Sequence, residues 1–219
     1  MSSTPSSSVP PVAHRWRRVR WLLAAGLVLA VMLVVLRQPL LRGAAHLWIV
    51  EASPFAPVDA VVVNASGRHS ILDRSAQWVR DGQATRMILL RGETRATDRA
   101  GITPPILETR LRQLTEQGVP ESARVLVGEE LLTYHAEVST LAAWARSHAV
   151  GPVIFPVEPF ATRRVARLAR RVLAPAGVRA TVVPVAVPEY DVDRWWQSKE
   201  GLLAFEKECV LALYYWWRY

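Results

Sequence analysis

The sequence predicts an α/β fold: a Rossmann-like three-layer domain with a mostly parallel sheet of about five strands, preceded by one transmembrane helix. One uninterrupted apolar run lies near the N-terminus. After it, short runs rich in Val, Ile and Leu alternate with longer amphipathic segments, which is typical of βα units on a parallel sheet. At 219 residues the chain has room for one anchor and one domain of ordinary size. We expect a tail over residues 1–20, an anchor over 21–37, a linker over 38–57 and the domain over 58–219.

The first segment is rich in Ser and Pro and ends in a group of arginines. Its composition cannot bury enough apolar surface to become ordered, so residues 1–20 are expected to form a disordered, basic cytoplasmic tail. Residues 21–36 are 16 consecutive apolar or small residues, about 24 Å long as a helix, against a hydrocarbon core of roughly 30 Å. Arg20 and Arg37 flank this run and can reach toward the lipid head groups, so the run can serve as a membrane anchor.

A cleaved signal peptide is the alternative interpretation of this run. The run exceeds the usual apolar region of a signal peptide, ~7–15 residues, and Arg37, Pro39 and Arg42 interrupt the approach to the small residues at 43–45. We therefore favour an uncleaved anchor. Four arginines precede the run and two follow it, so the positive-inside rule places the N-terminus in the cytoplasm. The sequence thus predicts a single-pass protein of the plasma (inner) membrane, with the lipid bilayer as a partner and the domain in the periplasm or cell exterior.

Charge and cysteine content exclude several classes of protein. Six of the 27 Lys and Arg residues precede Glu51, where there is no acid, so the other 21 face 19 Asp and Glu residues. A domain this balanced lacks the broad basic surface that nucleic-acid binding requires, and we expect no nucleic-acid partner. Cys209 is the only cysteine, which excludes an intramolecular disulfide and a zinc site of the CxxC type, and we interpret it as a small apolar residue of a helix. No metal or cofactor is expected, and nothing indicates a protein partner.

After the linker, which contains Pro54 and Pro57, expected strands and helices alternate. The strands are short and rich in Val, Ile and Leu, as strands covered on both faces should be, and are expected at residues 58–63, 86–90, 124–127, 152–157 and 178–185. Helices are expected at residues 71–80, 103–117, 134–147, 162–173 and 194–217. Pro184 and Pro188 predict that the last strand lies at an edge of the sheet.

In open parallel sheets, ligands bind where strands end and helices begin, and four loops meet this condition here. Their candidate ligand-binding residues are Asn64, Ser66, Gly67, Arg68, Arg91, Gly92, Thr133, Arg163 and Arg164. The arginines could hold an anion, although ordinary turns and solvated charges would also explain these loops. Thr133 also suits the N-cap of the next helix.

Catalytic motifs are absent from the sequence: it contains no GxSxG, HExxH, P-loop or GxGxxG. Glu129 and His135 are the candidate general bases near the same edge of the sheet. Glu129 and Glu130 are adjacent, so in extended backbone they point to opposite faces and cannot act as a dyad. The motifs therefore identify no catalytic residue.

Two other segments have unusual composition, and each has two interpretations. Arg163, Arg167, Arg170 and Arg171 fall on one face of an expected helix, which is either a solvated face or a contact for anionic lipid head groups. The C-terminal end is aromatic, and packs either on the domain or at the membrane interface; its residues are Tyr214, Tyr215, Trp216, Trp217 and Tyr219.

Several short segments of the sequence, taken in their order along the chain, resemble a known family. The most specific is the run 195–202, WWQSKEGL, followed by Glu208 and the pair Tyr214 and Tyr215; weaker matches are VDAVVV at 58–63, Arg74-Ser75-Ala76, Glu108, Gly118-Val119-Pro120, Glu129, Thr133-Tyr134 and Arg163-Arg164. Together they are similar to bacterial envelope proteins of the SanA/ElyC/YdcF type, whose domain was long catalogued as having unknown function. Several polar positions of the family differ here, so the chain resembles a divergent member; the differing segments are Asn64-Ala65-Ser66, Arg91-Gly92-Glu93, 132–136, 160–164 and Leu211.

The resemblance implies a role in maintenance of the cell wall or envelope barrier. We expect an accessory protein that binds an anionic wall or lipid-linked precursor and supports envelope integrity. The alternative is an envelope hydrolase or transferase acting on a phosphorylated or lipid-linked precursor, with Glu129 or His135 as general base.

Overall fold

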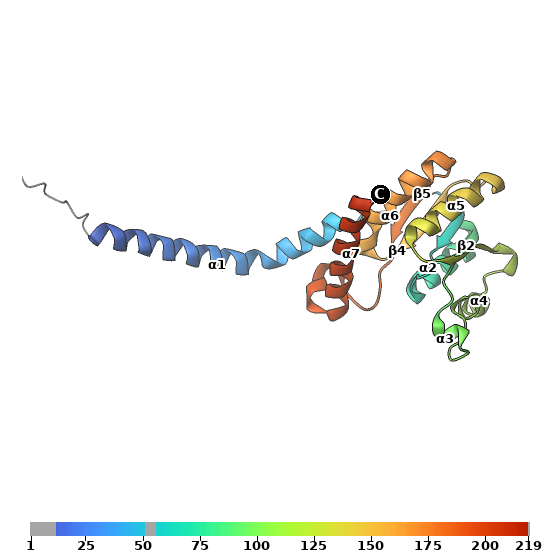
Figure 1. The fold of residues 1–219 in the computed structure, drawn as a ribbon, viewed down its shortest axis with the longest axis horizontal. Coiled ribbons are helices and arrows are strands. Elements are labelled where there is room, and N and C mark those ends of the chain that lie inside the picture. Colours follow the sequence, from blue (N-terminus) through green and yellow to red (C-terminus); the bar gives the residue numbers. More distant parts are fainter. Residues whose placement is uncertain (1–11, 51–55, 219) are drawn as a thin grey trace, which may run out of the picture. The chain divides into compact units, whose positions relative to one another are not determined.

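The computed structural model describes residues 12–50 and 56–218, and divides the chain into two units, residues 1–43 and 44–219 (Figure 1). Helix α1, Val12–Trp48, begins in the first unit and ends in the second. Its part Val19–Trp48 is long and apolar enough to cross a membrane. The parts of the expected tail and linker at residues 1–11 and 51–55 lie outside the described residues.

The bounds of α1 differ from those expected from the sequence. The expected disordered tail reached residue 20, but the chain is helical from Val12, and the expected linker began at residue 38, but the helix continues to Trp48. Helix-compatible residues explain both differences. No Pro or Gly lies between Val12 and Arg20, and the segment after Pro39 is rich in Leu and Ala, which favour helix. Composition alone therefore underestimated the length of this helix.

The second unit contains a five-stranded sheet in the order β3-β2-β1-β4-β5. Its strands are β1 (Val58–Val63), β2 (Ala84–Gly92), β3 (Arg124–Leu131), β4 (Val153–Val157) and β5 (Ala180–Pro184), and every neighbouring pair is parallel. The α/β prediction is confirmed, as is the edge position of the last strand. Because the chain order reverses between β1 and β4, the loops after these strands run to opposite faces, which leaves an opening at the carboxyl edge of the sheet.

Helices cover both faces of the sheet, which makes three layers (Figure 1). Helices α5 (Tyr134–His148) and α6 (Thr162–Val172) pack on the face that contains Val62, Ile88 and Phe155. Helices α2 (His69–Arg80) and α4 (Ile106–Glu116) pack on the face that contains Val61 and Met87. Successive strand residues enter opposite cores, which is why the buried stretches of the central strands, residues 60–63 and 87–90, are apolar without alternation.

The expected helix over residues 194–217 is divided into a 3-10 helix, η4 (Val192–Gln197), and helix α7 (Lys199–Arg218). Ser198 between them has extended backbone, φ −121° and ψ 147°, and its hydroxyl accepts a hydrogen bond of 3.0 Å from the N–H of Gly201. The hydroxyl satisfies a free N–H group of the first turn, as an N-cap does. Other short elements are α3 (Ala96–Arg99), η1 (Glu121–Ala123), η2 (Pro159–Ala161) and η3 (Ala174–Ala176).

An aromatic cluster fixes α7 and the end of α1 to the domain. Trp195 stacks on Phe205, with ring centroids 4.1 Å apart, and Trp48 meets Phe205 edge-on at 6.2 Å. Thr162, the first residue of α6, accepts a hydrogen bond of 2.8 Å from the N–H of Val50 and lies 3.2 Å from the carbonyl oxygen of Trp48, to which its hydroxyl can donate. Residues 48–50 are therefore part of the folded domain.

We expect Gly201→Ala to lower the free energy of unfolding by about 1–3 kcal/mol, the usual cost of overpacking. A Cβ at this position would overlap the carbonyl oxygen of Trp195 and lie 2.9 Å from the hydroxyl of Ser198. Urea denaturation of the full chain in detergent micelles, followed by tryptophan fluorescence, measures the change. Leu202→Ala is the control, because Leu202 is 47% exposed in the same turn. An unchanged unfolding midpoint for Gly201→Ala would show that η4 and α7 adjust without cost.

Candidate functional site

The carboxyl edge of the sheet holds three adjoining cavities. The one that we call the rim pocket has a volume of about 260 Å³ and lies between the loop after β1, the end of β2 and the start of α5; its lining includes Ala65, Ser66, Gly92, Leu131, Thr133 and Glu137. Two neighbours of about 340 and 200 Å³ share Ile106 with it. The structure thus brings Ser66, Gly92 and Thr133, three of the expected ligand-binding residues, to one cavity.

The loop after β1 is fixed by a buried arginine. Arg110 of α4 donates hydrogen bonds to the carbonyl oxygens of Asn64, at 3.1 Å, and Gly67, at 2.6 Å. Asn64 is itself buried and donates from Nδ2 to the hydroxyl of Ser66 at 2.9 Å. A Cβ on Gly67 would come within 2.8 Å of the side-chain oxygen of Asn64, so the loop requires glycine there. Arg110 was not among the expected site residues, and burial lowers the pKa of its guanidinium.

Two of the arginines expected to hold an anion are paired within the protein. Arg68 donates to Glu158 at 2.9 Å and to Glu189 at 2.8 Å. Arg91 donates to the carbonyl oxygen of Gly128 at 2.5 Å and to Glu129 at 2.6 Å. Each guanidinium already has carboxylate neighbours, so an incoming anion would be repelled by them or would have to displace them.

The expected roles near α5 are resolved by geometry. Thr133 is the N-cap, and its hydroxyl accepts a hydrogen bond of 3.1 Å from the N–H of Ala136, as expected. Glu129 has a side chain that is 76% exposed, and Glu130 turns away from it at a positive φ of 49° to bind Thr94. His135 lies 3.5 Å from the hydroxyl of Ser139. Neither Glu129 nor His135 lines the rim pocket.

The acid that does line the rim pocket is Glu137. Its side chain is 3% exposed; one carboxylate oxygen accepts a hydrogen bond from the N–H of Ala65, and Oε2 has no hydrogen-bond partner among the described residues. Burial raises the pKa of Glu137 to about 7, against the opposing effects of that N–H group and of Arg110 and Arg164. This role could not be predicted from the residue pattern, because an acid in the first turn of a helix is ordinary.

Arg164, another expected ligand-binding residue, is a buried structural group. Its guanidinium donates two hydrogen bonds, of 2.8 and 2.9 Å, to the carboxylate of Glu208 on α7, and the two side chains are 5% and 9% exposed. The guanidinium lies 5.0 Å from the ring centre of Tyr134 and 5.2 Å from that of Tyr215. This ion pair joins α6 to α7.

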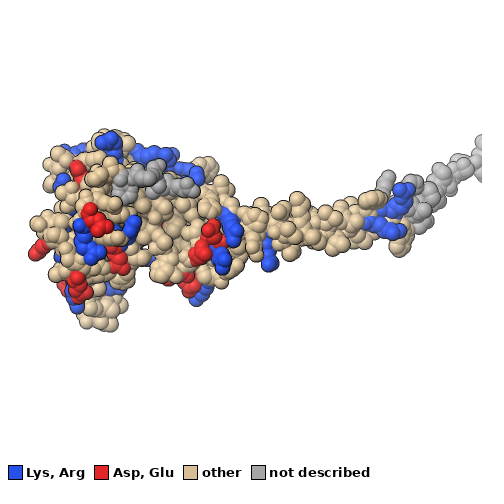
Figure 2. All heavy atoms as spheres, turned by 180° about the vertical axis from the view of Figure 1, so that it is seen from behind, with Lys and Arg blue, Asp and Glu red and all other residues tan. Residues whose placement is uncertain are grey.

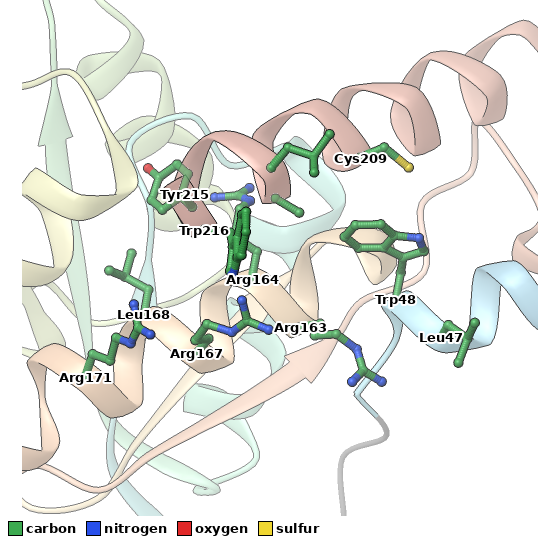
Figure 3. A pocket seen from close by; sticks show the side chains of 12 residues that line it. Leu47, Trp48, Arg163, Arg164, Arg167, Leu168, Arg171, Cys209, Tyr215 and Trp216 are labelled. Carbon is green, nitrogen blue, oxygen red and sulfur yellow. The ribbon is translucent and has the colours of Figure 1, made fainter. Parts of the chain in front are cut away.

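Arg163 lines a different cavity, which we call the α6–α7 groove. It has a volume of about 500 Å³, and Figure 3 shows side chains from the end of α1, from α6 and from α7 converging on it. The lining is mostly apolar and includes Leu47, Trp48, Leu168, Cys209, Leu213 and Trp216. Arg163 and Arg167 are exposed at its edge, and the part of the chain described by the structure offers them no hydrogen bond or ion pair.

The residues of the aromatic C-terminal end differ in burial. Tyr215 packs over Arg164, whereas Trp216 and Trp217 are 73% and 80% exposed. Elsewhere the surface of the domain is mixed in charge: Figure 2 shows basic and acidic side chains interspersed over the face that it displays. Within residues 12–50 and 56–218, no group of three or more His, Cys, Asp or Glu side chains could hold a metal ion.

Comparisons with known proteins add little to this geometry. No protein-family model matches the chain, and no curated protein matches it. Among solved structures, the chain is similar to a universal stress protein in complex with cAMP, with 17% sequence identity and a TM-score of 0.38. The likeness covers 60% of this chain and 98% of the other. At this TM-score we infer nothing about ligands from it, and the α/β class rests on the parallel sheet itself.

Proposed function

We propose that the protein is a membrane-anchored accessory protein of the cell envelope that binds an anionic lipid-linked precursor in the α6–α7 groove. The observation that carries the proposal is an apolar groove with two unpaired guanidinium groups, Arg163 and Arg167, at its edge. Such a groove suits an amphiphile whose chain lies on apolar side chains and whose phosphate meets the arginines. Of the expected anion-binding arginines, Arg163 is the one that keeps this role.

The position of the groove along the chain supports a ligand from the bilayer. Leu47 and Trp48 line the groove and are the last residues of the apolar helix α1. The groove therefore adjoins, along the chain, the helix that we propose as the membrane anchor, which favours a ligand that is itself held in the bilayer. Trp216 and Trp217 are exposed beside it, and tryptophan is enriched at membrane interfaces. With the arginines before residue 21 on the cytoplasmic side, the domain and its groove would face the periplasm or cell exterior.

The sequence resemblance supports an envelope role, and the geometry bears on the enzyme alternative. A hydrolase or transferase would need a base beside the bound precursor. Glu129 is exposed and paired with Arg91, and neither it nor His135 lines the groove. We therefore favour recognition of the precursor over its turnover.

The single cysteine of the chain provides a direct test, because Cys209 lines the groove. In nanodiscs of phosphatidylcholine, inclusion of phosphatidic acid is expected to slow alkylation of Cys209 by a maleimide about fivefold or more, since a bound lipid phosphate shields the thiol. Replacement of both Arg163 and Arg167 by Gln should remove this difference, because charge-assisted contacts to the phosphate are lost. Burial raises the pKa of the Cys209 thiol, so the reaction is run at mildly alkaline pH.

Arg170→Gln is the matched control, since Arg170 is exposed on the same helix but does not line the groove. In this variant, phosphatidic acid should slow the alkylation of Cys209 as much as it does in the unchanged chain. If phosphatidic acid and phosphatidylcholine protect Cys209 equally, or if the double variant keeps the protection, the groove does not recognise an anionic head group.

A further inference from the structure

The rim pocket holds a polar group that the proposed function does not use. Glu137 is 3% exposed, lines the pocket, and has one oxygen, Oε2, without a hydrogen-bond partner among the described residues. Buried polar atoms in folded proteins are almost always hydrogen-bonded, so an unpaired one calls for a specific explanation. The pocket supplies the space for a group that would complete the hydrogen bonding of this carboxyl.

The pocket lies at the carboxyl edge of the sheet, on the β2 side of the reversal between β1 and β4. Ala65 follows β1, Gly92 ends β2 and Leu131 ends β3, so the carboxyl ends of three neighbouring strands form its base. A Cβ on Gly92 would come within 2.6 Å of the Cβ of Ala65, so the two loops are as close as their side chains permit. The walls are therefore set by backbone that the sheet positions, which is the usual foundation of a ligand site.

The charged groups around Glu137 already have hydrogen-bond or ion-pair partners of their own. Arg110 of α4 and Arg164 of α6 face it, but the first is bonded to the loop after β1 and the second to Glu208. At the mouth, Arg95 pairs with Asp98, and Glu93 pairs with Arg99. Tyr134, in the turn before Glu137, contributes a phenol that is held neutral by burial, because burial raises its pKa. An anion entering the pocket would find the guanidinium groups of Arg110 and Arg164 already hydrogen-bonded, and a neutral ligand loses less hydration on entry than an ion does.

The hydrogen-bonding chemistry of the Glu137 carboxyl further limits the classes of ligand that the pocket could bind. With its pKa near neutrality, Glu137 is present both as a carboxylate, which only accepts hydrogen bonds, and as an acid, which also donates one. A hydroxyl group can donate to the first and accept from the second, whereas an ammonium only donates and a phosphate oxygen chiefly accepts. Ser66 and Thr133 line the same pocket and have hydroxyl protons to donate.

We propose that the rim pocket is a second ligand site, separate from the α6–α7 groove, which takes an uncharged hydroxyl-bearing group of the size of a single sugar ring, with Glu137 as its recognition residue. The site does not depend on lipid binding in the groove. Arg110 is a positioning residue, because it holds the loop that donates the N–H of Ala65 to Glu137.

Saturation-transfer NMR tests this with three sugars that share one ring and differ in charge: glucose, glucosamine and glucuronate. The full chain is used in nanodiscs of phosphatidylcholine, which contain no sugar. We expect transfer to glucose, and at least threefold less to the two charged sugars. Glu137→Leu should abolish transfer to glucose, while Glu137→Gln should retain it, because the amide can both donate and accept.

Glu108→Leu is the control, since Glu108 is exposed and lines the neighbouring cavity rather than the rim pocket. If Glu137→Gln retains transfer to glucose, the loss in Glu137→Leu comes from the missing hydrogen bonds and not from a damaged fold. The proposal is wrong if glucose receives no saturation from the unchanged chain, if Glu137→Leu leaves the transfer intact, or if glucuronate or glucosamine receives more than glucose.

Discussion

Removal of the guanidinium of Arg164 is expected to lower the free energy of unfolding by about 3–5 kcal/mol, the cost of leaving one member of a buried ion pair alone. In Arg164→Met the carboxylate of Glu208 keeps its burial and loses both of its hydrogen bonds to the guanidinium. The rings of Tyr134 and Tyr215 also lose the cation between them. Urea denaturation of the full chain in detergent micelles, followed by tryptophan fluorescence, measures the loss.

The double variant Arg164→Met with Glu208→Leu separates the ion pair from its packing. Replacing both partners by apolar groups of similar size removes the stranded charge, so most of the lost stability should return. Arg167→Met is the control, because Arg167 is exposed on the same helix. If the double variant is no more stable than Arg164→Met, the cost comes from altered packing of α6 on α7 and not from the unpaired carboxylate.

Glu137→Gln is expected to stabilise the protein at alkaline pH and to leave it nearly unchanged at about pH 5. The folded state raises the pKa of Glu137 from 4.5 to about 7, so between these values it binds more protons than the unfolded state. The stability of the unchanged chain therefore falls as pH rises through this window, by up to roughly 3 kcal/mol, and stays low above it. Glutamine carries no charge at any pH and escapes this loss.

Unfolding by urea at about pH 5 and about pH 9 measures the effect, which is read as the difference between Glu137→Gln and the unchanged chain. That difference should grow with pH. Glu108→Gln serves for comparison, because Glu108 is exposed and no pH-dependent gain is expected from it. Equal stabilisation by Glu137→Gln at both pH values would mean that the carboxyl is not held in its neutral form by the fold.

Much of the fold could be predicted because its signals are local. Strand β1 has the expected bounds, since residues 60–63 enter both cores in turn and are all apolar. Helix α5 begins at Tyr134 because Thr133 caps it. The break at Ser198 could not be foreseen, because it depends on Trp195 packing against Phe205 and on a carbonyl group that leaves room only for Gly201.

The location of the candidate site could be predicted from the sequence, but the interactions of its charged residues could not. The loops after β1 and β2 and the start of α5 do meet in the rim pocket, as the general rule for parallel sheets requires. The ion pairs at that edge of the sheet could not be predicted, because they join residues far apart in the sequence, such as Arg68 and Glu189. The same holds for Arg110, which approaches the loop after β1 from another helix.

The hydroxyl of Thr162 gives the domain a mechanical property. It accepts a hydrogen bond from the N–H of Val50 and lies within 3.2 Å of the carbonyl oxygen of Trp48, although the carbonyl oxygen of Pro159 is closer, at 2.7 Å. Thr162 is also the first residue of α6, whose first two turns carry Arg163 and Arg167. The end of α1 is thus coupled to the arginine-bearing helix by side-chain contact in addition to its covalent connection toward β1. If α1 spans a membrane as we propose, a displacement of that helix would therefore reach the groove through α6.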